Sequence, residues 1–150
     1  MFISIGATTP SDSNIYQYQF IKTTYTDDVE IKTIISSKEE LNSLYEKYKD
    51  SLYLEHRGKV YANSTIGFID VIEKYDEEYF KENNLIIIYL TEPSRLIRHD
   101  IKDVEIKYNT LDINIIQKSL DYGTCDMAGW LLILEVENTS NIMKINYRKA

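Results

Sequence analysis

The sequence is poor in the residue types that most often build catalytic or metal-binding sites. Its single cysteine, Cys125, cannot form an internal disulfide bond, so crosslinks do not stabilise the chain and the redox compartment stays open. Its two histidines, His56 and His99, lie far apart without paired histidine or cysteine spacing, which argues against a zinc site. Its five glycines are scattered, so it lacks a glycine-rich phosphate loop. We therefore expect no cofactor and no metal ion.

Basic residues are also scarce. The chain has 17 Lys and Arg residues against 24 Asp and Glu residues, a net charge of -7. Proteins that neutralise phosphates need clustered cations, so this balance argues against nucleic acid and anionic membranes as partners. No stretch of the sequence reaches the length of a transmembrane helix, so we expect no direct membrane insertion of the chain.

Long apolar runs are absent except for one. Residues 85–90, Leu-Ile-Ile-Ile-Tyr-Leu, form the only uninterrupted apolar run longer than five residues. A polar turn precedes the run, and Thr91, Glu92 and Pro93 follow it. A run of this length between turns is typical of a strand that is buried on both faces. We expect the other elements to pack against this strand.

The early part of the chain alternates between apolar and polar residues. Residues 15–25 place Tyr18 and Phe20 on one side, which is the period of a half-buried strand. Residues 29–35 alternate again after a Thr-Asp-Asp turn. The two segments therefore predict a hairpin.

A helix is predicted over residues 37–48. The hydroxyl of Ser37 and the carboxylate of Glu40 have the spacing of a capping box, in which each accepts a free amide at the helix start. Its apolar positions recur at helical spacing, namely Leu41, Leu44, Tyr45 and Tyr48. A second, short helix is predicted over residues 76–82, with Asp76 as its cap.

The later part of the chain predicts strands. Residues 97–108 alternate but change phase, which a bulge near residues 102–103 would reconcile, and residues 111–115 alternate back. Residues 130–136 predict a last strong strand and residues 142–147 a weaker one.

Strands outnumber helices and are joined mostly by short turns, which predicts an α+β fold with a largely antiparallel sheet. We expect a curved antiparallel sheet or an open barrel, packed against the main helix. The length matches one domain. We therefore expect a flexible N-terminal segment at residues 1–14 and a single α+β domain at residues 15–150.

Charges of both signs gather at one end of the predicted central strand. Glu92 precedes the Pro93 turn, and Arg98, His99 and Asp100 follow it. Such a group is either an ion-pair or acid/base cluster, or a solvated strand end with one salt bridge. Solvated strand ends are the commoner case, so we favour that interpretation here.

Cys125 raises the alternative of a small cysteine-dependent enzyme. A thiol nucleophile needs a base within hydrogen-bond reach, and His99 is the candidate. The adjacent carboxylate of Asp126 would raise the thiol pKa and oppose activation. The sequence itself does not bring Cys125 and His99 together, so this alternative ranks last.

The order of the predicted elements resembles a known family. The motif Ser-Lys-Glu-Glu-Leu at residues 37–41 opens the helix, Tyr-Phe-Lys-Glu-Asn-Asn at residues 79–84 enters the central strand, and a meander and an apolar strand follow. Over about residues 34–136 this pattern resembles the PrcB C-terminal domain family, which is named after a subunit of a bacterial surface protease complex. At residues 93–96 the chain has Pro-Ser-Arg-Leu where members often carry a Thr-Gly-Gly-Tyr-like turn, so a function of that turn is not transferred.

The resemblance implies a non-enzymatic module of the bacterial cell envelope that binds or stabilises a protease or another surface protein. It transfers no catalytic residue. The compartment is unknown: the cell envelope or the extracellular space is favoured, and a cytoplasmic location is also compatible with the sequence.

Our leading hypothesis is therefore a protein-binding or accessory domain. We expect its contact at residues 92–98 and 123–130, with Trp130 and the tyrosines as anchors if they are exposed and as core if they are buried. The candidate binding residues are Glu92, Ser94, Arg95, Arg98, His99, Asp126 and Trp130.

A second hypothesis is an acidic inhibitor or decoy that occupies a basic groove of another protein. It predicts one negative face formed by four carboxylates, Asp76, Glu77, Glu78 and Glu82. The 13 tyrosines fit either an interface, where tyrosine is enriched, or a large core.

Overall fold

The two most apolar strands of the sequence form the centre of the fold. The computed structural model describes residues 3–4, 14–55, 67–119 and 126–150. In it, β5 (Asn83–Glu92) and β8 (Ala128–Glu137) pair antiparallel along their full length. Side chains alternate between the two faces of a strand, so strands that are apolar at successive positions bury both faces. The predicted doubly buried strand at residues 85–90 is confirmed.

Two further strands, which are more polar, flank this central pair. β3 (Tyr18–Thr23) pairs with β8 and β4 (Lys32–Ile35) pairs with β5, which gives the order β3-β8-β5-β4. The predicted hairpin between residues 15–25 and 29–35 is therefore wrong, because these strands lie at opposite edges of the sheet. Strands that are apolar on both faces take the interior positions and leave the edges to the half-polar strands.

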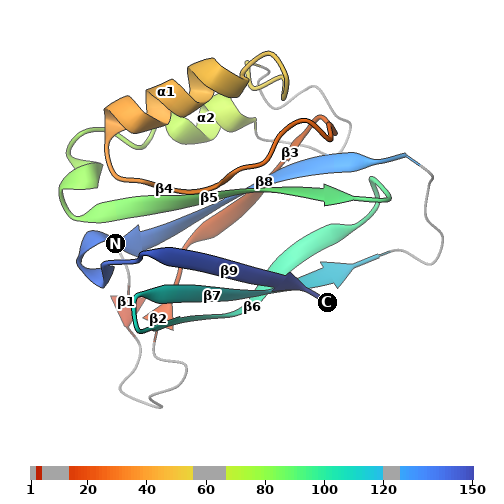
Figure 1. The fold of residues 1–150 in the computed structure, drawn as a ribbon. Coiled ribbons are helices and arrows are strands. Elements are labelled where there is room, and N and C mark those ends of the chain that lie inside the picture. The colour runs from red at the N-terminus through yellow and green to blue at the C-terminus, as the bar shows by residue number, and fades with distance from the viewer. Residues whose placement is uncertain (1–2, 5–13, 56–66, 120–125) are drawn as a thin grey trace.

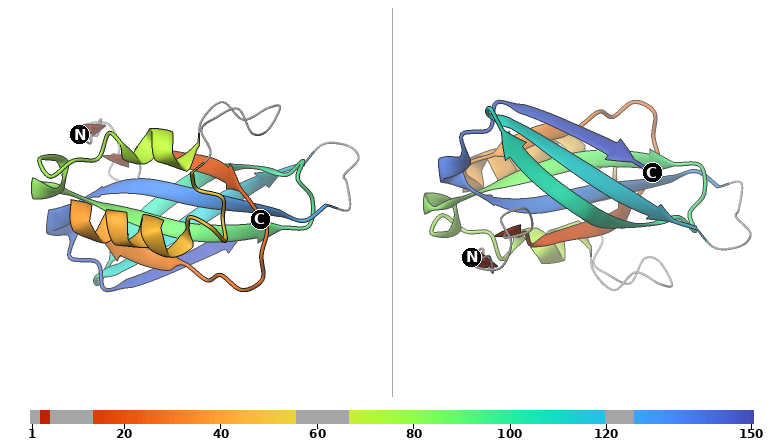
Figure 2. Two further views of the ribbon diagram at one scale, coloured as in Figure 1. Left: turned by 90° about the horizontal axis from the view of Figure 1, so that it is seen from above. Right: turned by 90° about the horizontal axis from the view of Figure 1, so that it is seen from below.

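Helices cover one face of this sheet (Figure 1). α1 (Lys38–Tyr48) and α2 (Phe68–Ile72) both lie over it, as the view from above also shows (Figure 2). Leu41 and Leu44 of α1 are buried in the core between the helices and the sheet. The narrow apolar stripe predicted for this helix thus packs on the sheet as expected.

The helix ends show which local signals were informative. The hydroxyl of Ser37 accepts a hydrogen bond from the amide of Glu40 at 3.0 Å. The carboxylate of Glu40 accepts one from the amide of Ser36 at 2.6 Å. The first bond confirms the main helix and its N-cap, Ser37, whereas Glu40 binds the amide of the residue before the cap and not that of Ser37, so the capping box is confirmed only in part. The carboxylate of Asp76 accepts a hydrogen bond from the amide of Tyr79 at 2.8 Å, where a 3-10 helix, Tyr79–Lys81, begins, so the short helix predicted there is only one turn long. The short second α-helix is α2, which lies earlier in the chain than the short helix predicted from the sequence.

A second sheet lies on the other side of the central sheet (Figure 1). It contains β6 (Arg98–Lys107), β7 (Thr110–Lys118) and β9 (Lys144–Lys149), in the order β6-β7-β9. β6 and β7 form the predicted antiparallel hairpin, and their register shifts between Ile101 and Asp103, which confirms the bulge. β7 and β9 are parallel, the one parallel pair among the described strands.

The alternation of β5 and β8 divides the apolar residues into two cores. Odd-numbered residues such as Ile87 and Ile133 pack against the helices. Even-numbered residues such as Ile88 and Leu132 pack against the second sheet. By the same alternation Glu92 faces the second sheet and position 135 faces the helices.

Further short elements complete the described chain. β1 (Ile3–Ser4) pairs with β2 (Asn14–Ile15), and a 3-10 helix, Asn138–Ser140, follows β8. Most of the segment predicted to be flexible, residues 1–14, lies outside the described residues. The fold is α+β with two main curved sheets, which are not closed into a barrel. In the part of the chain that the structure describes, no helix is long and apolar enough to cross a membrane.

Candidate functional site

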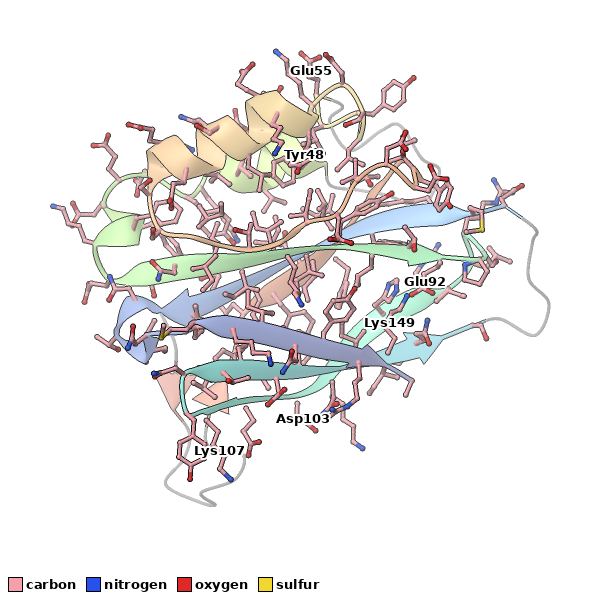
Figure 3. The ribbon with its side chains drawn as sticks, in the orientation of Figure 1. Tyr48, Glu55, Glu92, Asp103, Lys107 and Lys149 are labelled. Carbon is pink, nitrogen blue, oxygen red and sulfur yellow. The ribbon has the colours of Figure 1, made fainter. Side chains whose placement is uncertain are left out.

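A buried carboxylate lies where β5 ends. Glu92 is the last residue of β5 and is 1% exposed, and its even-numbered position directs it to the second sheet. His99 Nε2 lies 2.6 Å from its Oε2 and Gln117 Nε2 donates to its Oε1 at 2.7 Å. Lys149 Nζ lies 3.4 Å from Oε2 and donates to the carbonyl of Thr91 at 2.8 Å. Figure 3 shows Glu92 and Lys149 together at this end of the two sheets.

We call Glu92, His99, Gln117 and Lys149 the Glu92 cluster. Its members come from β5, β6, β7 and β9, so the cluster joins the central sheet to every strand of the second sheet. Both oxygens of the carboxylate have donors, which is the condition for burying a charge at acceptable cost.

The imidazole of His99 is enclosed by aromatic rings. It stacks on Phe20 at 5.0 Å between ring centroids and meets the edge of Trp130 at 5.3 Å. Its side chain is 0% exposed, and this burial lowers the pKa of His99 although the hydrogen bond to Glu92 opposes the effect. The ring is therefore neutral at pH 7. Because a carboxylate only accepts, Nε2 carries the proton, and the buried Nδ1 has no partner among the described residues.

The turn between β5 and β6 brings charged side chains to the surface above the Glu92 cluster. Ser94 is 7% exposed and holds the turn, since its hydroxyl accepts the amide of Leu96 at 3.1 Å. Arg95 is exposed, and its Nε lies 3.5 Å from Oδ2 of Asp126. Arg98 donates to the carbonyl of Arg95 at 2.7 Å, and its guanidinium lies 5.4 Å from the centre of the Trp130 ring.

A third cation reaches the same place from β3. Lys22 is paired with Trp130 in the register of β3 and β8, and its Nζ lies 5.0 Å from the centre of the Trp130 ring. Burial lowers the pKa of Lys22, and the nearby charges of Arg98 and Arg95 lower it further. We call the exposed and half-buried group at this end the Arg95 surface; it consists of Lys22, Arg95, Arg98, Asp126 and Met127.

The structure gathers the seven candidate binding residues at one end of the molecule but at different depths. Glu92, His99 and Trp130 are interior, so the interpretation of a solvated strand end is wrong for Glu92 and His99. Trp130 is 6% exposed and belongs to the core. Ser94 supports the turn, and three residues reach the surface: Arg95, Arg98 and Asp126.

Sequence reasoning missed Lys22, Gln117 and Lys149. Lys22 has the same strand parity as Tyr18 and Phe20, which was a usable signal. Gln117 and Lys149 carried no such signal, because they lie on the second sheet and contact Glu92 of the central sheet. No local sequence pattern links the two sheets.

The proposed thiol site cannot be assembled from the described residues. Cys125 lies outside them. His99 is closed to solvent, and Asp126 contacts Arg95. Within the described ranges no group of three or more His, Cys, Asp or Glu side chains is arranged to hold a metal ion.

A second buried carboxylate lies on the opposite face of the central sheet. Glu135 of β8 is 5% exposed and faces the helix layer. Tyr75 donates its hydroxyl to Oε2 of Glu135 at 2.9 Å, and Lys74 Nζ lies 3.9 Å from the same oxygen. Burial and the charge of Glu135 raise the pKa of Tyr75 well above its usual value. Tyr79 packs against Tyr75, with 4.7 Å between the ring centroids.

The carboxylates that the decoy hypothesis placed on one face are all exposed: Asp76, Glu77, Glu78 and Glu82. Two of them already have local roles, because Asp76 accepts a hydrogen bond from the amide of Tyr79 and Glu78 lies 3.1 Å from Lys81. One of the four carboxylates, Glu78, is therefore paired with a cation.

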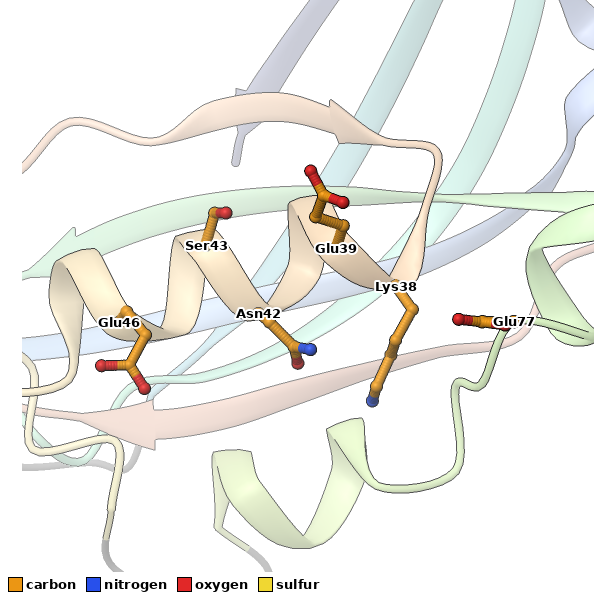
Figure 4. A pocket seen from close by; sticks show the side chains of 6 residues that line it. All are labelled: Lys38, Glu39, Asn42, Ser43, Glu46 and Glu77. Carbon is orange, nitrogen blue, oxygen red and sulfur yellow. The ribbon is translucent and has the colours of Figure 1, made fainter.

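A shallow depression of about 550 Å³ lies between α1 and the segment before β5 (Figure 4). Its lining residues are Lys38, Glu39, Asn42, Ser43, Glu46 and Glu77. Lys38 extends from α1 and donates to the carbonyl of Ile72 at 3.2 Å, so its charge ties the two helices together. The depression is open and its carboxylates are solvated.

Comparison of the chain with protein-family models, with curated proteins and with solved structures finds no match. The resemblance to the PrcB C-terminal domain family therefore stays a prediction from the sequence.

Proposed function

We propose that this chain is a non-enzymatic protein-binding domain that contacts another protein through the Arg95 surface. The observation that supports it is the meeting of two segments about thirty residues apart in the chain. Arg95 from one segment contacts Asp126 from the other at 3.5 Å, and Arg98 lies over Trp130.

The Arg95 surface rests on a buried frame. The Glu92 cluster ties the β5–β6 turn to the second sheet, and Ser94 and the Arg95 carbonyl fix the path of the turn. A surface whose backbone is already ordered loses less entropy when it binds a partner. The buried residues thus serve as support, while the exposed ends of Arg95, Asp126 and Met127 make the contact.

The PrcB-like pattern suggests what the partner is. A protease or another protein of the bacterial cell envelope fits an accessory domain of this kind. In such a pair the domain stabilises or modulates its partner and performs no chemistry of its own.

Site-specific crosslinking tests this proposal. A photoreactive residue replaces Met127, which is 47% exposed, or Tyr108, which is 88% exposed and follows β6 at the other end of the second sheet. In lysates of the source cells we expect an adduct with one defined protein from position 127 and none from position 108.

Variants with the same number of lost charges complete the test. Arg95→Ala with Arg98→Ala should abolish the adduct, and Lys107→Ala with Lys144→Ala, at the far end, should leave it intact. An adduct from position 108 alone, or equal loss in both double variants, would overturn the placement. No adduct from either position would overturn the binding function itself.

A further inference from the structure

The Arg95 surface is an exception in an acidic protein. The chain has a net charge of -7, yet Lys22, Arg95 and Arg98 converge here from three separate elements. Two of the three lie within 5.4 Å of the centre of the same Trp130 ring. This places several positive charges on one small area.

These cations repel one another. The charges of Arg98 and Arg95 lower the pKa of Lys22, in addition to the effect of its burial. An anion bound between them would reduce this repulsion, because it would add negative charge close to all three cations. Binding energy is thus available to a negatively charged ligand.

Asp126 shows the type of group that fits. Its carboxylate lies 3.5 Å from Arg95 Nε, and both side chains are more than half exposed, at 63% and 59%. An exposed pair of this kind contributes little to stability, so a partner's carboxylate can replace or join Asp126 at little cost. Met127, 47% exposed, adds an apolar contact at the edge of the surface.

The size of the surface and the charge of the rest of the chain limit the ligand. A long polyanion such as nucleic acid would extend beyond three cations and meet a surface that is negative overall. A short segment with a few carboxylates would not. We infer that the Arg95 surface binds a short acidic segment of its protein partner, with one apolar side chain of that segment against Met127. This inference rests on the proposed function.

A pair of peptides tests the inference. The probe is a capped octapeptide of alternating Glu and Leu with a fluorescent label, and its control has Gln in place of Glu. We expect the Glu peptide to bind at least about tenfold more tightly than the Gln peptide, and less tightly as salt is added. Nuclear magnetic resonance should place the shift changes at residues 94–98 and 126–130, with a rise in the pKa of Lys22 on binding.

Matched variants decide whether the named cations are responsible. Arg95→Ala with Arg98→Ala should weaken binding of the Glu peptide about tenfold, and Asp126→Asn should strengthen it. Lys107→Ala with Lys144→Ala should leave the affinity unchanged. Circular dichroism confirms that each variant is folded. Equal binding of both peptides, or shift changes elsewhere, would overturn the inference. The same holds if inorganic phosphate binds at these residues while the two peptides do not differ.

The crosslinking experiment separates the two proposals. An adduct from position 127 together with equal peptide affinities would reject the acidic ligand and keep the binding function. Absence of both would reject both.

Discussion

The two buried carboxylates, Glu92 and Glu135, lie at opposite ends of the β5–β8 pair and on opposite faces of the central sheet. Glu92 pairs in register with Ala128, whereas Glu135 pairs with Leu85. Glu92 has hydrogen-bond donors from two strands of the second sheet, His99 and Gln117, and an ion-pair partner from the third, Lys149, which is 26% exposed. Glu135 has one phenol donor, and its cation Lys74 is 49% exposed at a longer distance.

The difference shows two ways to bury a charge. Around Glu92 the protein provides a closed set of donors, so the charge is neutralised inside the fold. Around Glu135 it provides the hydroxyl of Tyr75, with the buried hydroxyl of Tyr79 nearby, and leaves the counter-charge near solvent. The closed arrangement fixes the β5–β6 turn under the Arg95 surface, whereas the open one fixes only the contact between the helix layer and the sheet.

The largest expected effect is that of Glu92→Ala. It removes the acceptor of His99 and Gln117 and the ion-pair partner of Lys149, and breaking a buried pair in this way costs about 3–5 kcal/mol. Glu135→Ala leaves one buried hydroxyl without its acceptor, which costs about 1–3 kcal/mol. Urea denaturation measures both free energies of unfolding.

Glu105→Ala is the control for this comparison, because Glu105 is exposed on β6 and should change stability by less than about 0.5 kcal/mol. If Glu135→Ala proved as costly as Glu92→Ala, the two environments would be equivalent and the contrast between closed and open arrangements would fail.

The next effect is the dependence of stability on pH, which separates the two regions. Burial lowers the pKa of His99 below its usual 6.5, so its contribution is present above pH 6.5 and is lost as pH falls through the folded-state value. The pKa of Tyr75 is raised above 10.0, so its contribution is present below pH 10 and is lost as pH rises. The free energy of unfolding should therefore decline on both sides of this range.

One substitution tests each side. His99→Gln keeps a donor for Glu92 but cannot titrate, so the decline that begins as pH falls below about 6.5 should shrink. Asp100, whose pKa the hydrogen bond from Tyr18 lowers, contributes only below about pH 4 and does not obscure this window. Tyr75→Phe should reduce the alkaline decline only. If His99→Gln altered the alkaline decline in the free energy of unfolding, or Tyr75→Phe the acid decline, the two regions would be coupled.

Local patterns explain which parts of this fold were predictable. The apolar run of β5, the N-cap of α1 and the phase change of β6 are each complete within about ten residues, and all three were predicted correctly. The pairing of β3 and β4 was not, because it depends on β5 and β8 occupying the interior of the sheet. Strand partners are decided by burial across the whole chain, which no short window contains.

The candidate site divides in the same way. The charges flanking the Pro93 turn were visible in the sequence, but their depth was not. Glu92 and His99 are buried only because a second sheet covers them, and the donors from Gln117 and Lys149 arrive from that sheet. A prediction of the site therefore required the packing of the two sheets and not only the order of the strands.

The smallest expected effect is that of Lys74→Ala. Lys74 Nζ lies 3.9 Å from Glu135 and half of its side chain is exposed, so water can replace it and the loss should stay below about 1 kcal/mol. Lys149→Ala should cost more, because Lys149 lies 3.4 Å from Glu92 and also donates to the Thr91 carbonyl. Both values come from the same urea titrations. If Lys74→Ala matched Glu135→Ala, the charge of Glu135 would depend on Lys74 as strongly as on Tyr75. The environment of Glu135 would then be as closed as that of Glu92, with the exposed Lys74 as a necessary partner.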